Sequence, residues 1–286
     1  MNVVRFVKKC VFAPNEALLS VRLVARSFYG RLYWRLKPDA PLEYYLPERT
    51  KILLEPRHSF TQCFWPGVIA YEPDVQQLLR IYLKPGMVFV DCGANVGLFS
   101  LMAGGLVGPT GKVVSIEANP DTVKLLNRNL AANGLPEGKN CAVSATNGTA
   151  EFLIASAGDV YGTLKSNEYV PAESKTISVT TRTLDDIVQD AGLAKVDFIK
   201  IDVEGGEIDC LRGADKTLRN HKPMVVLEYG TSTWPGFNHT PEELIAIADN
   251  YGYELKMLDV TMKTLVPVSV AVWSSGYANV VMLPKS

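Results

Sequence analysis

Two short segments of this sequence combine acids and glycines in an arrangement that could bind a small ligand. In VDCGANVG, Asp91 ends an apolar run, and Gly93 and Gly97 follow it. In KIDVEGGE, Asp202 and Glu204 end a second apolar run and precede two more glycines. An apolar run that passes through glycines into a helical pattern is typical of the ligand-binding turns of doubly wound folds. Both segments are therefore candidates for one binding edge.

The spacing of the first segment separates two classes of ligand. A dinucleotide fingerprint counted from Gly93 requires glycine at positions 95 and 98, where Asn95 and Leu98 stand. The remaining pattern, D-x-G-x-x-x-G, is similar to that of class I methyltransferases, which bind S-adenosylmethionine. An acid at this place suits a ligand with an ammonium and a sulfonium group, whereas it would repel a pyrophosphate. The segment thus predicts S-adenosylmethionine as cofactor, with an empty tight turn as the alternative.

A further acid follows at the distance expected of a ribose ligand. Glu117 ends the next apolar run, 24 residues after Gly93, and Pro120 then opens a helical pattern. An acid at the end of this second strand can accept hydrogen bonds from both ribose hydroxyls. Glu117 therefore adds to the prediction for the glycine loop.

Three carboxylates and one imidazole are candidate catalytic groups. Side chains alternate along a strand, so Asp202 and Glu204 point roughly the same way. Glu228 ends the following strand, and His239 lies in the loop after it. An alcohol attacks poorly until it loses its proton, so each of these groups could act as a general base, and the carboxylates could hold a divalent metal. Alternatively, Asp202 and Glu204 stabilise the start of the following helix, and His239 is a solvated or capping residue of its loop.

Together, GANVGLFS, IEANP and KIDVEGGEIDCLRGA resemble the FkbM family of S-adenosylmethionine-dependent methyltransferases, over about residues 73–230. The resemblance implies O-methylation of a hydroxyl group on a sugar, a glycolipid or another natural product. It also implies a set of cofactor-binding residues, with Asp202 at the same edge: Glu72, Asp91, Gly93, Ala94, Asn95, Gly97, Glu117, Ala142 and Val143.

The elements that must position these residues follow from hydrophobic periodicity. Strands are predicted at 88–91, 112–117, 140–143, 196–202, 224–228, 254–258 and 278–283, and helices at 73–83, 97–106, 120–133, 184–191, 207–218 and 241–251. Such alternation predicts an α/β fold, Rossmann-like and doubly wound, with a mostly parallel seven-stranded sheet covered on both faces. Two more strand-like runs, 150–155 and 176–182, predict an antiparallel insertion.

Residues 1–70 are expected to form an N-terminal extension of a methyltransferase domain that covers residues 71–286. A helix is predicted over 15–36, followed by a proline-containing linker and by a hairpin over 50–67 that turns near Pro56. Residues 1–37 hold eight basic residues and one acid, a charge of +7 that leaves −8 on the remainder. This helix could lie at a membrane interface, or pack between protein surfaces, including those of a homo-oligomer.

Composition excludes several classes of function. The net charge of −1 on 286 residues provides no electrostatic drive toward nucleic acid, and DVEG stands where base methyltransferases carry an N/D-P-P-Y/F segment. Five scattered cysteines and the absence of a long apolar run predict a cytoplasmic protein, peripheral to a membrane at most. We expect a small-molecule, glycan or glycolipid acceptor. Methylation of protein or nucleic acid, and a non-catalytic cofactor-binding module, are the alternatives.

The charge of residues 1–37 predicts an anionic partner, because the cofactor is itself cationic at sulfur. The two candidates are an anionic membrane surface and an acidic acceptor. Each basic residue at such a surface contributes on the order of 1 kcal/mol, and salt screens this attraction beyond about 10 Å at 0.1 M. In co-sedimentation, the full-length protein should bind anionic liposomes at low salt and leave them at high salt. A protein without residues 1–37 should stay in solution and still methylate a soluble acceptor. Full-length protein that ignores the liposomes at low salt would favour the packing role.

Overall fold

The computed structural model describes residues 32–56, 58, 61, 71–155, 162–166, 174–274 and 276–285. The chain divides into two compact units, residues 1–44 with 53–71, and residues 45–52 with 72–286. Of the helix predicted over 15–36, residues 32–36 are described and are helical, whereas the rest lies outside the described residues. No helix among the described residues has both the length and the apolar character needed to cross a membrane.

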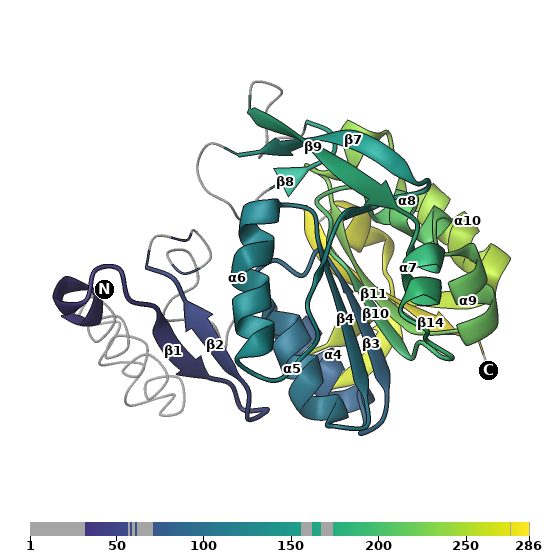
Figure 1. Cartoon of the computed structure of the whole chain (residues 1–286). Helices are drawn as coiled ribbons and strands as arrows, with labels where there is room; N and C mark the ends of the chain where they lie inside the picture. Colours follow the sequence, from purple (N-terminus) through teal and green to yellow (C-terminus); the bar gives the residue numbers. More distant parts are fainter. Residues whose placement is uncertain are drawn as a thin grey trace, which may run out of the picture. The chain divides into compact units, whose positions relative to one another are not determined.

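A mixed sheet forms the centre of the larger unit, in the strand order β13-β12-β14-β11-β10-β3-β4-β5 (Figure 1). Its strands are β3 (Val88–Cys92), β4 (Lys112–Glu117), β5 (Lys139–Asn140), β10 (Phe198–Ile201), β11 (Met224–Gly230), β12 (Tyr253–Asp259), β13 (Thr264–Pro267) and β14 (Tyr277–Pro284). The five strands from β5 to β11 pair in parallel, while β14 runs antiparallel to β11 and β12. The strand order reverses at β3, because β4 and β5 follow on one side of it and β10 and β11 on the other. The prediction of a Rossmann-like, doubly wound α/β fold is therefore confirmed. Strand β13 adds an eighth member.

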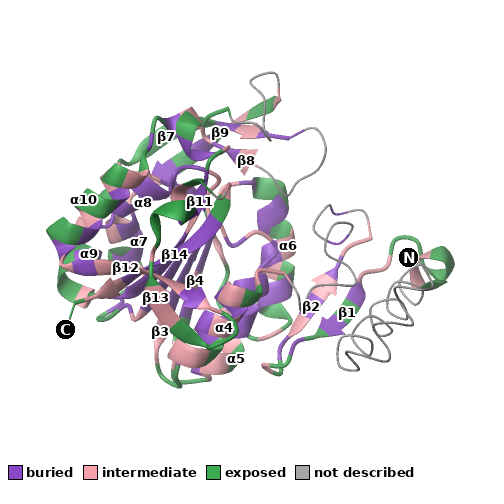
Figure 2. Ribbon diagram, turned by 180° about the vertical axis from the view of Figure 1, so that it is seen from behind, coloured by how far each residue is buried: buried purple, intermediate pink, exposed green. Residues whose placement is uncertain are grey.

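Helices cover both faces of this sheet, as Figure 1 shows. On one face lie α4 (Pro73–Tyr82), α5 (Leu98–Val107) and α6 (Pro120–Ala131); on the other lie α7 (Leu184–Asp190), α8 (Glu207–Arg212), α9 (Asp215–His221) and α10 (Pro241–Tyr251). Val90, Ile199 and Val225 pack into the core beneath the second group. Their strand neighbours alternate to the opposite face, which places Asp91 and Lys200 side by side in register. The strands are therefore largely buried (Figure 2).

The predicted antiparallel insertion is confirmed as a second sheet, β6-β9-β7-β8. It contains β6 (Ala142–Val143), β7 (Gly148–Ile154), β8 (Gly162–Thr163) and β9 (Lys175–Arg182), and β7 pairs antiparallel with β9. The single strand predicted at 140–143 is wrong. The chain leaves the central sheet after Asn140, passes through Cys141, and enters the second sheet because β6 pairs with β9 and not with β4.

Most of the second half of the hairpin predicted over 50–67 lies outside the described residues, and near its predicted turn the His58 N–H donates to the Glu55 carbonyl at 3.3 Å. Strand β2 (Lys51–Leu54) pairs with β1 (Leu42–Tyr45), which lies before it in the predicted linker, through a turn at residues 46–50. The Leu46 N–H donates to the Thr50 carbonyl at 2.8 Å. The Asn133 side chain holds Lys51 by accepting from its N–H at 2.8 Å and donating to its carbonyl at 2.7 Å. A side chain 82 residues away thus fixes the end of the turn.

The helix predicted over 207–218 is broken in two. Helix α8 ends at Arg212, and α9 begins at Asp215. The Gly213 carbonyl between them accepts from the Asp185 N–H at 3.0 Å. In return, the Asp185 carboxylate accepts from the N–H groups of Lys216 and Thr217, each at 2.8 Å. Because Asp185 satisfies the first donors of α9 from outside, the chain restarts the helix here.

Asp185→Ala should lower the free energy of unfolding by about 1–2 kcal/mol, because it leaves the α9 amides without their acceptor. The matched control is Asp190→Ala, which removes an exposed carboxylate at the other end of α7 from an ion pair with Arg182 and should change stability little. Urea unfolding followed by circular dichroism measures both. Equal effects of the two variants would contradict this account of the helix break.

Candidate functional site

The glycine loop lies between the ends of two neighbouring strands. The N–H groups of Gly93 and Ala94 donate to the Ile116 carbonyl of β4 at 3.0 and 2.8 Å. Gly93 has a φ of +79°, and a Cβ atom at this position would collide with the backbone of Asp202, just beyond β10. Only glycine therefore permits this approach. Gly97 has a φ of +96° and precedes helix α5.

Glu117 is oriented by two backbone amides. Its Oε2 accepts from the Asn95 N–H at 3.0 Å, and its Oε1 accepts from the Asn119 N–H at 2.8 Å. Burial raises the pKa of Glu117, and these hydrogen bonds only partly offset the rise. The Ala118 amide also stabilises this carboxylate, whose two oxygens together can accept about four hydrogen bonds. The residue thus fits the predicted role of binding a pair of hydroxyl groups.

Asp91 lies beneath the loop and is fully buried. Its Oδ2 accepts from the Ser100 hydroxyl at 2.6 Å, and Ser100 in turn accepts from the Ser115 hydroxyl at 2.7 Å. Burial raises the pKa of Asp91, while Lys200 and Ser100 act in the opposite direction. These hydrogen bonds join β3 to helix α5 and, through Ser100, to β4, and the predicted contact of Asp91 with the cofactor stays a prediction.

Lys200 is a site residue that the sequence interpretation missed. It is buried on β10, and its Nζ donates to Asp202 Oδ2 at 2.7 Å. The same Nζ lies 4.8 Å from the ring centre of Phe99 on α5. Burial lowers the pKa of Lys200, but Asp202, Glu72 and Asp91 outweigh it and the pKa is raised. The sequence did contain a signal for this role, since Lys200 stands two residues before Asp202 in an otherwise apolar strand.

The three predicted carboxylates meet at the carboxyl edge of the sheet. Burial acts to raise the pKa of Asp202, but Lys200 and a hydrogen bond with Glu228 hold it below its usual value. Burial, the charge of Asp202 and that hydrogen bond place the pKa of Glu228 well above its usual value. The hydrogen bond between the two thus favours the proton on Glu228 and the negative charge on Asp202.

Glu204 combines an unusual backbone with an unusual carboxyl. Its φ of +57° is left-handed, which is uncommon outside glycine and frequent at functional sites. Its carbonyl accepts from the Thr163 hydroxyl of β8 at 3.0 Å, so the insertion supports this turn. Burial, then the charges of Asp202 and Glu207, raise the pKa of Glu204 well above its usual value. A carboxylate with a raised pKa is a stronger base than an ordinary one, as a general base requires.

Glu72 reaches the same cluster from helix α4. It precedes the helix with a φ of +40°, and its charge acts on Lys200 and Glu204. Two more residues of the predicted cofactor-binding set are buried: Ala142 belongs to the core of the second sheet, and Val143 to the main core.

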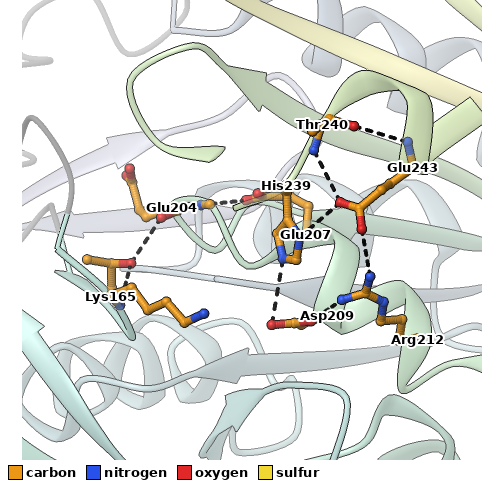
Figure 3. Close-up of polar contacts among 10 residues, drawn as sticks. Lys165, Glu204, Glu207, Asp209, Arg212, His239, Thr240 and Glu243 are labelled. Atoms are coloured by element: carbon orange, nitrogen blue, oxygen red, sulfur yellow. Dashed lines mark hydrogen bonds and ion pairs between the residues drawn. The ribbon is translucent and has the colours of Figure 1, made fainter. Parts of the chain in front are cut away.

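His239 makes its described contacts with helices α8 and α10 (Figure 3). Its Nδ1 lies 3.3 Å from Glu243 and its Nε2 lies 3.6 Å from Asp209, while its ring stacks on Phe237. Arg212 joins the same two acids, each at 2.9 Å. These contacts tie the two helices together and place Glu204 ahead of His239 as the candidate base.

Glu207 closes the turn on which Glu204 stands. Its Oε1 accepts from the N–H groups of Val203 and Gly205 at 2.9 and 3.2 Å. Burial raises the pKa of Glu207 to about 7. Across the described part of the chain, no group of three or more His, Cys, Asp or Glu side chains is arranged to hold a metal ion.

Comparison with known proteins identifies relatives of this site. The sequence model for the methyltransferase FkbM domain matches residues 91–255. Methyltransferase sdnD of Sordaria araneosa is 28% identical over 195 residues, which cover 58% of this chain and 73% of that protein. 2-O-methyltransferase NoeI of Sinorhizobium fredii is 27% identical over 166 residues, 54% of this chain and 68% of its own. The crystal structure of methyltransferase FkbM from Methylobacillus flagellatus has a TM-score of 0.43 and 16% identity, covering 72% of this chain and 50% of that one.

Gly93→Ala should abolish binding of S-adenosylmethionine, because the added methyl group forces the loop away from Asp202. Gly134→Ala is the matched control: its φ of +69° carries a similar backbone strain, but nothing lies within 4 Å of an added Cβ. Titration calorimetry measures the affinity, and circular dichroism verifies the fold. An unchanged affinity of Gly93→Ala would remove the loop from cofactor binding.

Proposed function

The chain belongs to the FkbM family of methyltransferases, and on that premise we propose that it transfers a methyl group from S-adenosylmethionine to a hydroxyl oxygen. The proposed acceptor is a small molecule: a sugar, a glycolipid or another natural product. The observation that carries the proposal is the left-handed Glu204, with its raised pKa, beside Asp202 and Glu228. The name of the relative NoeI, a 2-O-methyltransferase, supports oxygen as the atom methylated.

The residues of the crevice fit the proposed cofactor. S-adenosylmethionine brings a methyl group already activated by a positive sulfur. Gly93 lets the loop backbone lie close to Asp202. Glu117 offers oriented carboxylate oxygens as acceptors for ribose hydroxyls. The negative charge of Asp202 and Glu72 near this edge favours a cationic ligand.

In the proposed reaction, Glu204 acts as general base. The acceptor oxygen bonds to the methyl carbon, the carbon–sulfur bond breaks with its electron pair left on sulfur, and the hydroxyl proton passes to the Glu204 carboxylate. Asp202 remains ionised because Lys200 holds it, so it cannot easily take that proton. Aligning the two reactants and excluding water account for the rest of the catalysis.

We also propose a cytoplasmic location. The described cysteines Cys92, Cys141 and Cys210 are free and buried. Free thiols are typical of proteins in reducing compartments.

Glu204→Gln should lower turnover about a hundredfold or more, with little change in cofactor affinity, because the amide cannot accept the hydroxyl proton. Wild-type activity should rise with pH through the raised pKa of Glu204, because the base works only when unprotonated, and this rise should be absent from the variant. Formation of S-adenosylhomocysteine with simple glycosides is the assay. Glu254→Gln, on the exposed side of β12, is the matched control.

A chelator separates base from metal in the same assay. Loss of activity in EDTA that Mg²⁺ or Mn²⁺ restores would assign the carboxylates to a metal, whereas indifference to EDTA would favour the base. A fully active Glu204→Gln variant would remove this residue from the mechanism. Cofactor that binds without ever being turned over would point to the non-catalytic alternative.

A further inference from the structure

A hollow of about 470 Å³ lies at the start of β14, between helix α4 and the end of β12. Pockets that bind small molecules have volumes of roughly 300–1,000 Å³. The walls are mainly apolar and are formed by Met257, Leu258, Ala271, Val272 and Ala278. The hollow therefore has the size and lining of a small-molecule site.

Asn279 joins two other polar residues that line this hollow, Asp74 and Tyr277. The Asn279 amide donates to Asp74 Oδ2 at 2.9 Å and to the Tyr277 hydroxyl at 3.0 Å. The Tyr277 ring is 48% exposed, so an aromatic face remains open beside the apolar walls. Asn279 donates both amide hydrogens within this group, so its side-chain carbonyl oxygen can accept from another group.

Strand β14 links the hollow to the carboxylate cluster through Asn279. Asn279 on β14 is the register partner of Glu228 on β11, and such cross-strand neighbours have Cβ atoms about 4.5–5.5 Å apart. Burial, and after it the charges of Glu72 and Glu228, raise the pKa of Tyr277. Tyr277 and Asn279 thus form a wall shared by the hollow and the site of methyl transfer.

We propose that this hollow is the acceptor subsite and that it takes an uncharged hydroxyl compound with an apolar body, its hydroxyl directed toward Glu228 and Glu204. This inference rests on the proposed function and deepens it. Apolar walls gain about 25 cal/mol for each Å² of apolar surface that the acceptor buries. The carboxylate of Asp74 disfavours an acidic acceptor, and no lysine or arginine is among the described residues that line the hollow.

Binding of three glycosides to the full-length protein, in the presence of S-adenosylhomocysteine, tests the proposal by calorimetry. Hexyl β-glucoside should bind at least about tenfold more tightly than methyl β-glucoside, because its chain covers the apolar walls. Hexyl β-glucuronide, with the same chain and an added carboxylate, should bind about tenfold more weakly than hexyl β-glucoside. Asp74→Asn should reduce this difference in affinity between hexyl β-glucuronide and hexyl β-glucoside.

Ala271→Trp should fill the hollow and weaken hexyl β-glucoside about tenfold or more, with cofactor affinity unchanged. Val270→Trp is the matched control. Val270 is next to Ala271 in the sequence, but it is 84% exposed and does not line the hollow. No binding of the hexyl glucoside, or equal effects of the two tryptophans, would overturn the subsite while cofactor binding still stood. A protein that binds the glycoside but not S-adenosylmethionine would instead overturn the proposed function.

Discussion

One buried ammonium group, that of Lys200, sets the charge state of the whole acidic edge. A cation held out of water must be paired, and the 2.7 Å contact with Asp202 pairs it. Asp202 is thereby fixed as the ionised acid. Glu228 and Glu204 then lie beside a permanent negative charge, which adds to their burial and raises the pKa of both. The same ion pair thus separates one carboxyl whose pKa is lowered, Asp202, from two whose pKa is raised.

This division of roles depends on a strained turn that is supported from two sides. Glu204 is left-handed, and a Cβ on Gly205 beside it would meet the Thr233 carbonyl at 2.7 Å. Glu207 holds the turn from within by accepting two of its amides. Thr163 holds it from the insertion. Strain of this kind persists only where the surrounding structure over-determines it, and here the central sheet and the insertion share that task.

Local patterns predicted the elements whose formation depends on nearby residues. Helix α10 was predicted to the residue, because Pro241 and the Thr240–Glu243 capping box mark its start in the sequence itself. The hairpin turn and the break after Arg212 were missed, since the partners that fix them, Asn133 and Asp185, lie 82 and 32 residues away. The cluster of Asp202, Glu204 and Glu228 followed from strand order. The role of Lys200 needed the register of β3 against β10, which periodicity does not contain.

The acids of the site also bear on the basic residues at the start of the chain. The +7 charge of residues 1–37 predicts an anionic partner, and an acidic acceptor is one of two candidates. An acceptor that enters beside Asp74, Asp202 and Glu72 meets negative charge wherever these acids are ionised. An acidic acceptor would be attracted by one segment and repelled by the other. The two charge patterns are compatible when they serve different partners, an uncharged acceptor at the sheet edge and an anionic surface for the basic segment.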